Sequence, residues 1–198
     1  MSGKIWIVWL MWFFIWCIDA SIWTAGVLLS EKLKLVHFQA EFLIPIYILP
    51  KLFLGILLTK LNGKFEKKRL AFVSCILSGS IFVIMGYLNN INLILLAIFM
   101  ASLLLTTAII SLAATFEDYV QRLGKHGAEL IGLEQSANSL GYIVSPILTF
   151  FIINSYNEQM PFVFWGLILV TWGVFSFLFV PKIINMPQSK IKIIDLDV

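Results

Sequence analysis

The feature that most constrains this chain is a series of six apolar stretches, each long enough to cross a lipid bilayer as a helix. A hydrocarbon core about 30 Å thick is spanned by about 20 helical residues. The stretches cover residues 5–29, 37–61, 70–88, 93–115, 129–153 and 161–180. We therefore predict an all-α membrane protein, with a six-span domain over residues 1–181 and a cytoplasmic tail over residues 182–198.

Composition favours lipid over water as the main solvent of the chain. Hydrophobic residues make up 60% of it and charged residues 13%, whereas soluble domains are about 45–50% apolar and about 25% charged. Short segments of alternating polarity, as in a membrane β-barrel, do not appear in the sequence. Nor does a basic face on a soluble element, so nucleic acid is not an expected partner. The expected partners are membrane lipid and a small-molecule substrate.

The basic residues predict the orientation of the spans. Cytoplasmic loops of membrane proteins carry an excess of Lys and Arg. One side of the predicted bundle holds eleven basic residues, the opposite side holds Lys32 and Lys34, and Lys51 lies within the second span. Both termini are therefore expected to be cytoplasmic, as an even number of spans allows. The eleven are Lys4, Lys60, Lys64, Lys67, Lys68, Arg69, Arg122, Lys125, Lys182, Lys190 and Lys192.

Asp19 is the candidate site residue with the strongest physical argument. A charge in mid-bilayer costs about 2.5–3.5 kcal/mol on the insertion scale and marks function by default. Trp12, Trp16 and Trp23 have the spacing that places them on the helix face of Asp19. A carboxylate beside indoles suits a cationic amphipathic ligand. Two readings stay open: Asp19 binds a ligand or a proton with Trp16 and Trp23 in contact, or the tryptophans pack between helices and Asp19 has a structural partner.

Two further charges lie within predicted spans. Glu134 shares a helix face with Asn138, four residues later. It either exchanges protons or faces the cytoplasm in a wet vestibule. Lys51 follows Pro45 and Pro50, which remove backbone donors and bend the second span. It either neutralises Asp19 or Glu134, or extends its ammonium towards the cytoplasm.

The sequence carries none of the usual enzyme signatures. It has no glycine-rich phosphate loop, no metal-ligand spacing of His and Cys, and no nucleophile elbow. Both histidines, His37 and His126, lie outside the interiors of the spans. We expect neither an enzyme nor a cofactor or metal site.

The segment between the second and third spans carries the first family resemblance. It reads Gly-Ile-Leu-Leu-Thr-Lys-Leu-Asn-Gly-Lys over residues 55–64. This resembles the gating loop of the major facilitator superfamily, glycine-x-x-x-aspartate-arginine-x-glycine-arginine-lysine. Thr59 replaces the acidic residue, and the second glycine comes one position late. The residues that the resemblance assigns to the gate are Gly55, Lys60, Gly63, Lys64 and Arg69.

A second resemblance lies in the fifth span. Gly132 is followed after eight residues by Gly141, and after three more by Ser145 and Pro146. This is similar to the antiporter motif of drug:proton exporters, in which a further glycine stands at the Ser145 position. The glycines permit close helix packing and the proline bends the helix. Span four lacks the arginine that such exporters often carry; its polar residues include Thr106, Thr107 and Ser111.

The resemblance implies a 3+3 helix half of a major facilitator-type fold, with spans one, two, four and five lining the cavity. It implies secondary transport of a small organic solute, by efflux or exchange, with proton-coupled antiport as the form that the fifth-span motif suggests. The short loops favour a bacterial inner membrane. The family's fold has two such halves and this chain has one. Three explanations stay open: pairing with a second copy or a second six-helix half, a fragment, or a truncated remnant. The alternative function is a non-transporting scaffold or regulatory subunit.

Overall fold

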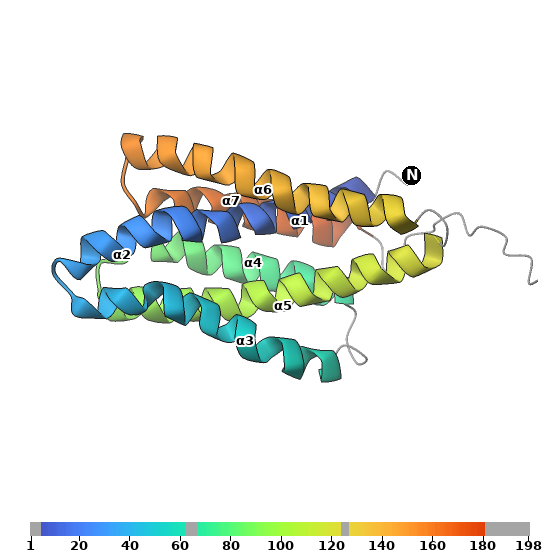
Figure 1. Ribbon diagram of the computed structural model, residues 1–198, viewed down its shortest axis with the longest axis horizontal. Coiled ribbons are helices and arrows are strands. Elements are labelled where there is room, and N and C mark those ends of the chain that lie inside the picture. Colours follow the sequence, from blue (N-terminus) through green and yellow to red (C-terminus); the bar gives the residue numbers. More distant parts are fainter. Residues whose placement is uncertain (1–4, 62–66, 124–126, 181–198) are drawn as a thin grey trace, which may run out of the picture.

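The computed structural model describes residues 5–61, 67–123 and 127–180, and this part of the chain is helical apart from short connections. Six segments are long and apolar enough to cross a membrane, which confirms the six predicted spans. Figure 1 shows their helices lying lengthwise beside one another in a single bundle.

Two spans contain an irregular turn. The first consists of α1 (Ile5–Ser21), a π-helical turn η1 (Ile22–Gly26) and α2 (Val27–Lys34). The second consists of a 3-10 turn η2 (Phe38–Phe42) and α3 (Leu43–Leu61). The other four are α4 (Lys67–Met85), α5 (Ile91–Leu123), α6 (Gly127–Ser155) and α7 (Met160–Phe179). Helix α5 runs about two turns beyond its predicted end, because helical hydrogen bonding continues into the charged segment 116–123.

The pattern of helix contacts stays the same when the first three spans are exchanged with the last three. The five most extensive helix contacts are α4 with α5, α4 with α7, α1 with α6, α3 with α5, and α1 with α7. Exchanging spans one to three for spans four to six turns the α1–α6 contact into α5–α3, and α1–α7 into α5–α4. The α4–α7 contact maps onto itself. The predicted 3+3 organisation is therefore present in the pattern of contacts.

Small residues bring α4 and α7 together at the back of the bundle. A Cβ atom added at Gly79 would lie 2.8 Å from the carbonyl oxygen of Gly166, and one added at Gly166 would lie 2.7 Å from that of Gly79. A Cβ at Gly173 would lie 2.7 Å from Ile76. Such small residues let helices approach closely in a membrane.

Pro50 divides α3 into a packed part and an exposed part. Before it, Leu43 and Tyr47 are fully buried. After it, Leu52 is 66% exposed, and a Cβ added at Gly55 would meet nothing within 4 Å. Figure 1 shows the end of α3 diverging from α5. A proline inside a helix removes one backbone hydrogen bond and favours such a bend.

Candidate functional site

Asp19 lies in the middle of the first span and is 1% exposed. Its Oδ1 atom accepts hydrogen bonds from the hydroxyl of Tyr47 and the ammonium of Lys51, both on α3. Its Oδ2 atom accepts a hydrogen bond of 2.6 Å from the hydroxyl of Tyr142 on α6. One buried carboxylate is thus bound by side chains of two other spans. We call these four residues the Asp19 cluster.

Lys51 is the counter-ion of Asp19. The sequence left Asp19 and Glu134 as alternatives, and the structure pairs Lys51 with Asp19. Its ammonium also lies 4.4 Å from the centre of the Tyr47 ring, within the range of a cation–π interaction. Because Tyr47 and Lys51 are four residues apart on α3, they share a helix face. The Lys51 side chain is 27% exposed, so the cluster borders the surface of the described bundle there.

The backbone around the cluster is held by hydroxyl groups. Ser102 on α5 donates a hydrogen bond of 2.5 Å to the carbonyl oxygen of Tyr47. In the first span, Thr24 donates to the carbonyl oxygens of Ala20 and Ser21. These bonds lie beside the π-helical turn, where the regular i to i−4 pattern is lost. The hydroxyl of Thr24 thus adds hydrogen bonds to carbonyl groups that directly follow Asp19.

A close contact between α1 and α6 brings Tyr142 to Asp19. A Cβ atom added at Gly141 would lie 2.8 Å from the Cβ of Trp16. Ser145 donates a hydrogen bond of 2.5 Å to the carbonyl oxygen of Cys17. Two residues of the antiporter-like motif are therefore at the helix contact. Gly132 is not, because a Cβ there would meet nothing within 4 Å.

The remaining motif residue, Pro146, lies half-buried inside α6. A proline there leaves the carbonyl group of Tyr142 without its helical donor. A bend of α6 at this proline would therefore be centred on the turn that carries Tyr142.

The three tryptophans of the predicted stripe have different surroundings. Trp12 is 4% exposed and Trp16 is half-buried, and their rings meet edge to face with centroids 5.6 Å apart. The Trp16 ring lies 5.8 Å from that of Tyr142, beside the cluster. Trp23 falls within the π-helical turn and is 44% exposed. The wider turn changes the helical register after Ser21, so Trp23 does not share the buried environment of Asp19.

Glu134 and Asn138 extend the polar face of α6 towards the predicted cytoplasmic end. Both are half-buried. With Tyr142 they are spaced four residues apart, so the three side chains follow one helix face over two turns. Glu134 also experiences the negative charge of Glu117 on α5. A polar stripe thus leads from the helix end to the Asp19 cluster.

Several buried polar atoms of α1 and α5 have no hydrogen-bond partner among the described residues. They are the indole nitrogens of Trp12 and Trp16 and the hydroxyls of Thr106 and Ser111. Thr106 follows Ser102 by one helical turn, on the same face of α5. Ser102 bonds the carbonyl oxygen of Tyr47, so Thr106 lies one helical turn beyond that contact on α5.

The residues assigned to the gate are only partly described. Gly55 lies on the exposed part of α3, and Lys60 belongs to its last helical turn. Gly63 and Lys64 lie outside the described residues. Arg69, in the first turn of α4, places its guanidinium carbon 5.8 Å from the ring of Phe177.

A neighbouring contact in the same turn joins α4 to α5. The ammonium of Lys67 lies 3.1 Å from both carboxylate oxygens of Asp118. The basic segment after the loop is therefore tied to the end of α5.

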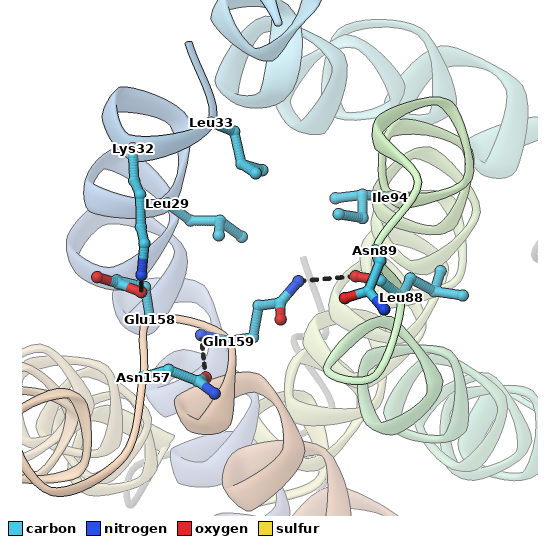
Figure 2. Close-up of a pocket in the computed structure, with 9 residues that line it drawn as sticks. All are labelled: Leu29, Lys32, Leu33, Leu88, Asn89, Ile94, Asn157, Glu158 and Gln159. Atoms are coloured by element: carbon cyan, nitrogen blue, oxygen red, sulfur yellow. Dashed lines mark hydrogen bonds and ion pairs between the residues drawn. The ribbon is translucent and has the colours of Figure 1, made fainter. Parts of the chain in front are cut away.

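A second polar feature lies at the opposite end of the bundle (Figure 2). The cavity there has a volume of about 180 Å³. The ammonium of Lys32 on α2 lies 2.6 Å from a carboxylate oxygen of Glu158, between α6 and α7. The hydrogen bond that Lys32 donates holds the pKa of Glu158 below its usual value of 4.5. The side-chain amide of Gln159 donates to the carbonyl oxygen of Leu88, 2.9 Å away. The lining residues are Leu29, Lys32, Leu33, Leu88, Asn89, Ile94, Asn157, Glu158 and Gln159.

Sequence reasoning missed Tyr47 and Tyr142 as partners of Asp19. Their positions nevertheless carried a signal. Tyr142 follows Gly141, the residue at which α6 touches α1, and it comes four residues after Asn138. Tyr47 precedes Lys51 by one turn. A buried tyrosine needs a partner for its hydroxyl, so tyrosines on the faces of charged residues were the candidates to consider.

Comparison with known proteins identifies the family to which the chain belongs. No curated protein and no solved structure matches the chain. The family model described as Major Facilitator Superfamily matches residues 8–192, nearly the whole chain. That range includes all six spans, the Asp19 cluster and the polar stripe of α6. The chain is a membrane protein that belongs to the major facilitator superfamily of transporters.

Proposed function

We propose that this chain is one half of a secondary active transporter that exports or exchanges a small organic solute in a bacterial inner membrane, with protons as the coupling ion. The observation that carries the proposal is the Asp19 cluster. A carboxylate that is 1% exposed in the middle of a span is costly. Here it joins three spans and borders the surface of the bundle at Lys51 and Tyr142.

The cluster also lies where movement of the spans would change it. Its members come from α1, α3 and α6. The helices α3 and α6 each contain an internal proline, and α1 is followed directly by a π-helical turn. Such interruptions mark places where helices bend. A small change in these bends would alter the bonds to Asp19, as a site that opens alternately to two sides requires.

Each predicted site residue then has a role. Asp19 binds the solute or the proton, with Trp16 and Trp23 as contacts of the solute. Glu134 and Asn138 connect Asp19 to the cytoplasm along α6. The segment from Gly55 to Arg69 acts as the cytoplasmic gate, with Lys67 and Asp118 tying it to α5. Gly141, Ser145 and Pro146 set the contact and bend of α6 against α1.

A transport assay tests the role of Asp19. The Asp19→Asn variant in proteoliposomes is expected to lose solute-driven proton movement, followed with a pH-sensitive dye across a panel of organic cations. Because this variant leaves Lys51 unpaired, the double variant Asp19→Asn/Lys51→Met serves as the folded control. It should regain stability without regaining transport. Transport at the wild-type rate by either folded variant would contradict the role of Asp19.

The proposed half-transporter requires a second six-helix unit. The native mass of the purified chain in a mild detergent tests this, with the detergent mass subtracted. A dimer would have about twice the mass of the 22.5 kDa chain. A chain that does not dimerise, transports nothing and co-purifies with another membrane protein would instead support a regulatory or scaffold role.

A further inference from the structure

The Asp19 cluster leaves hydrogen-bonding groups around it unused. The indole nitrogen of Trp16 and the hydroxyl of Thr106 are buried and have no partner among the described residues. The ring of Trp16 lies against that of Tyr142, and Thr106 lies one helical turn beyond Ser102, which bonds the carbonyl oxygen of Tyr47. Native interiors satisfy nearly all such groups. An ion pair that served only to join helices would gain nothing from unsatisfied polar groups beside it.

Lys51 occupies the position that a cationic ligand would take. Its ammonium has the carboxylate of Asp19 on one side and the ring of Tyr47 at 4.4 Å on another. A carboxylate together with an aromatic face is the usual environment of a bound organic ammonium ion. Here the cation comes from the protein itself, at the end of a flexible four-carbon stem.

Lys51 can also leave this position without breaking a span. Its side chain is 27% exposed, whereas Asp19 is 1% exposed. It follows Pro50, at which α3 loses a backbone hydrogen bond and diverges from α5. The next residue, Leu52, is 66% exposed. The ammonium therefore has a route outward along the free side of α3.

We propose that the ammonium of Lys51 is a tethered substitute for the cation of the transported solute. A small organic ammonium ion binds Asp19 in its place, and Lys51 moves aside. Trp16 and Thr106 then bond the neutral polar part of the solute. This inference rests on the proposed function and names the class of its substrate. Asp19 stays paired through the exchange, which avoids the cost of a buried unpaired charge.

Because Lys51 is attached to α3, it also competes with the solute for Asp19 and promotes release of the solute. A competitor attached to the same helix is present at a high effective concentration. The solute is therefore released when Lys51 returns, although Asp19 lies deep in the span.

Chemical rescue tests the proposal without a transport assay. Truncation in Lys51→Ala removes three methylene groups and the ammonium, and n-propylammonium supplies those same groups. At ten times its dissociation constant it is expected to raise the melting temperature of this variant by about 3–6 °C. The double variant Asp19→Asn/Lys51→Ala is the matched control and should not respond, nor should 1-propanol replace the amine. Equal shifts in both variants, or none in folded Lys51→Ala, would overturn the proposal.

Labelling of the wild-type chain gives an independent test if Lys51→Ala does not fold. Benzyltrimethylammonium combines a cation with an aromatic ring and does not react with amine reagents. It is expected to increase the acetylation rate of Lys51, measured by mass spectrometry, in a saturable manner. Lys34, which pairs with Glu41 outside the cluster, serves as the internal control and should not change. An unchanged rate at Lys51 would contradict the proposal even if the chain transports a solute.

Discussion

Two of the ion pairs that join the first span to the rest of the described bundle differ in what surrounds them. Asp19 on α1 is 1% exposed and is bound by three side chains from α3 and α6. Lys32 on α2 has a side chain that is 60% exposed and meets a single carboxylate, that of Glu158. Both pairs are close contacts. Their energetic roles differ because only the inner pair is removed from solvent.

The difference shows that distance alone does not rank ion pairs. An exposed pair contributes about 0–1 kcal/mol, since water competes with it and salt screens it. A buried pair gains little over an apolar replacement, yet losing one partner leaves an uncompensated charge. The inner pair is therefore costly to break without being a large source of stability. That combination suits a site whose partners exchange.

Breaking the inner pair from one side is expected to have the largest effect. Lys51→Met leaves the carboxylate of Asp19 buried without a counter-ion and should lower the free energy of unfolding by about 3–5 kcal/mol. Unfolding in mixed dodecyl maltoside and SDS micelles, followed by circular dichroism, measures it. The double variant Asp19→Asn/Lys51→Met should recover most of the loss. If the double variant were as unstable as the single one, packing and not charge would be the cause.

The helix contact that positions the inner pair gives the next largest effect. Gly141→Ala places a methyl group 2.8 Å from Trp16 and is expected to cost about 1–3 kcal/mol through overpacking. Gly132→Ala, on the same helix, is the matched control, because its methyl group meets nothing within 4 Å. Equal unfolding free energies for the two variants would show that α6 does not press on α1 at Gly141.

Removing one donor from Asp19 should have a smaller effect. Tyr142→Phe deletes the hydroxyl that bonds Oδ2. Since Tyr142 is 41% exposed, the expected loss is about 1.5 kcal/mol, at the low end for a hydrogen bond to a charged group. Tyr156→Phe, at a residue 77% exposed, provides the control and should change the unfolding free energy negligibly. A larger loss in Tyr156→Phe would reverse this ranking.

The outer pair is expected to show the smallest effects. Lys32→Met should cost less than about 1 kcal/mol at moderate salt, and still less at 1 M salt. A loss near that of Lys51→Met would remove the distinction between the two pairs.

Acid offers a second test of the outer pair. The pKa of Glu158 is lowered by Lys32, so the pair stabilises the fold above the usual pKa of a glutamate. Its contribution is lost as the pH falls through the lowered pKa. The difference in melting temperature between wild type and Lys32→Met should therefore shrink below about pH 4.5. A difference that grew on acidification would contradict the assigned shift.

The sequence predicted much of the fold because the bilayer constrains it strongly. Span length and apolar composition are sufficient to locate six helices. Asp19 was found for the same reason, since a charge is conspicuous among apolar residues. The location of the loops followed from where the apolar stretches stop.

The partners of these residues were harder to predict. In a helix that is apolar on all sides, the hydrophobic pattern does not say which face meets which neighbour. The contact of Lys32 with Glu158 joins residues 126 positions apart, and depends on how α2 is rotated. The predicted tryptophan stripe assumed a regular α-helix, and the π-helical turn at Ile22 altered the register for Trp23. Sequence spacing alone gave no sign of that turn.

The same π-helical turn determines the direction in which Lys32 points relative to Asp19, because Asp19 precedes the turn and Lys32 follows it on the same span. In an α-helix each residue adds about 100° of rotation. A π turn holds one residue more than an α turn, so a regular α-helix over the same residues would rotate α2 by about that amount relative to α1. Lys32 would then point away from Glu158 while Asp19 kept its partners. The extra residue held in the π-helical turn thus lets one span form ion pairs at two depths of the membrane.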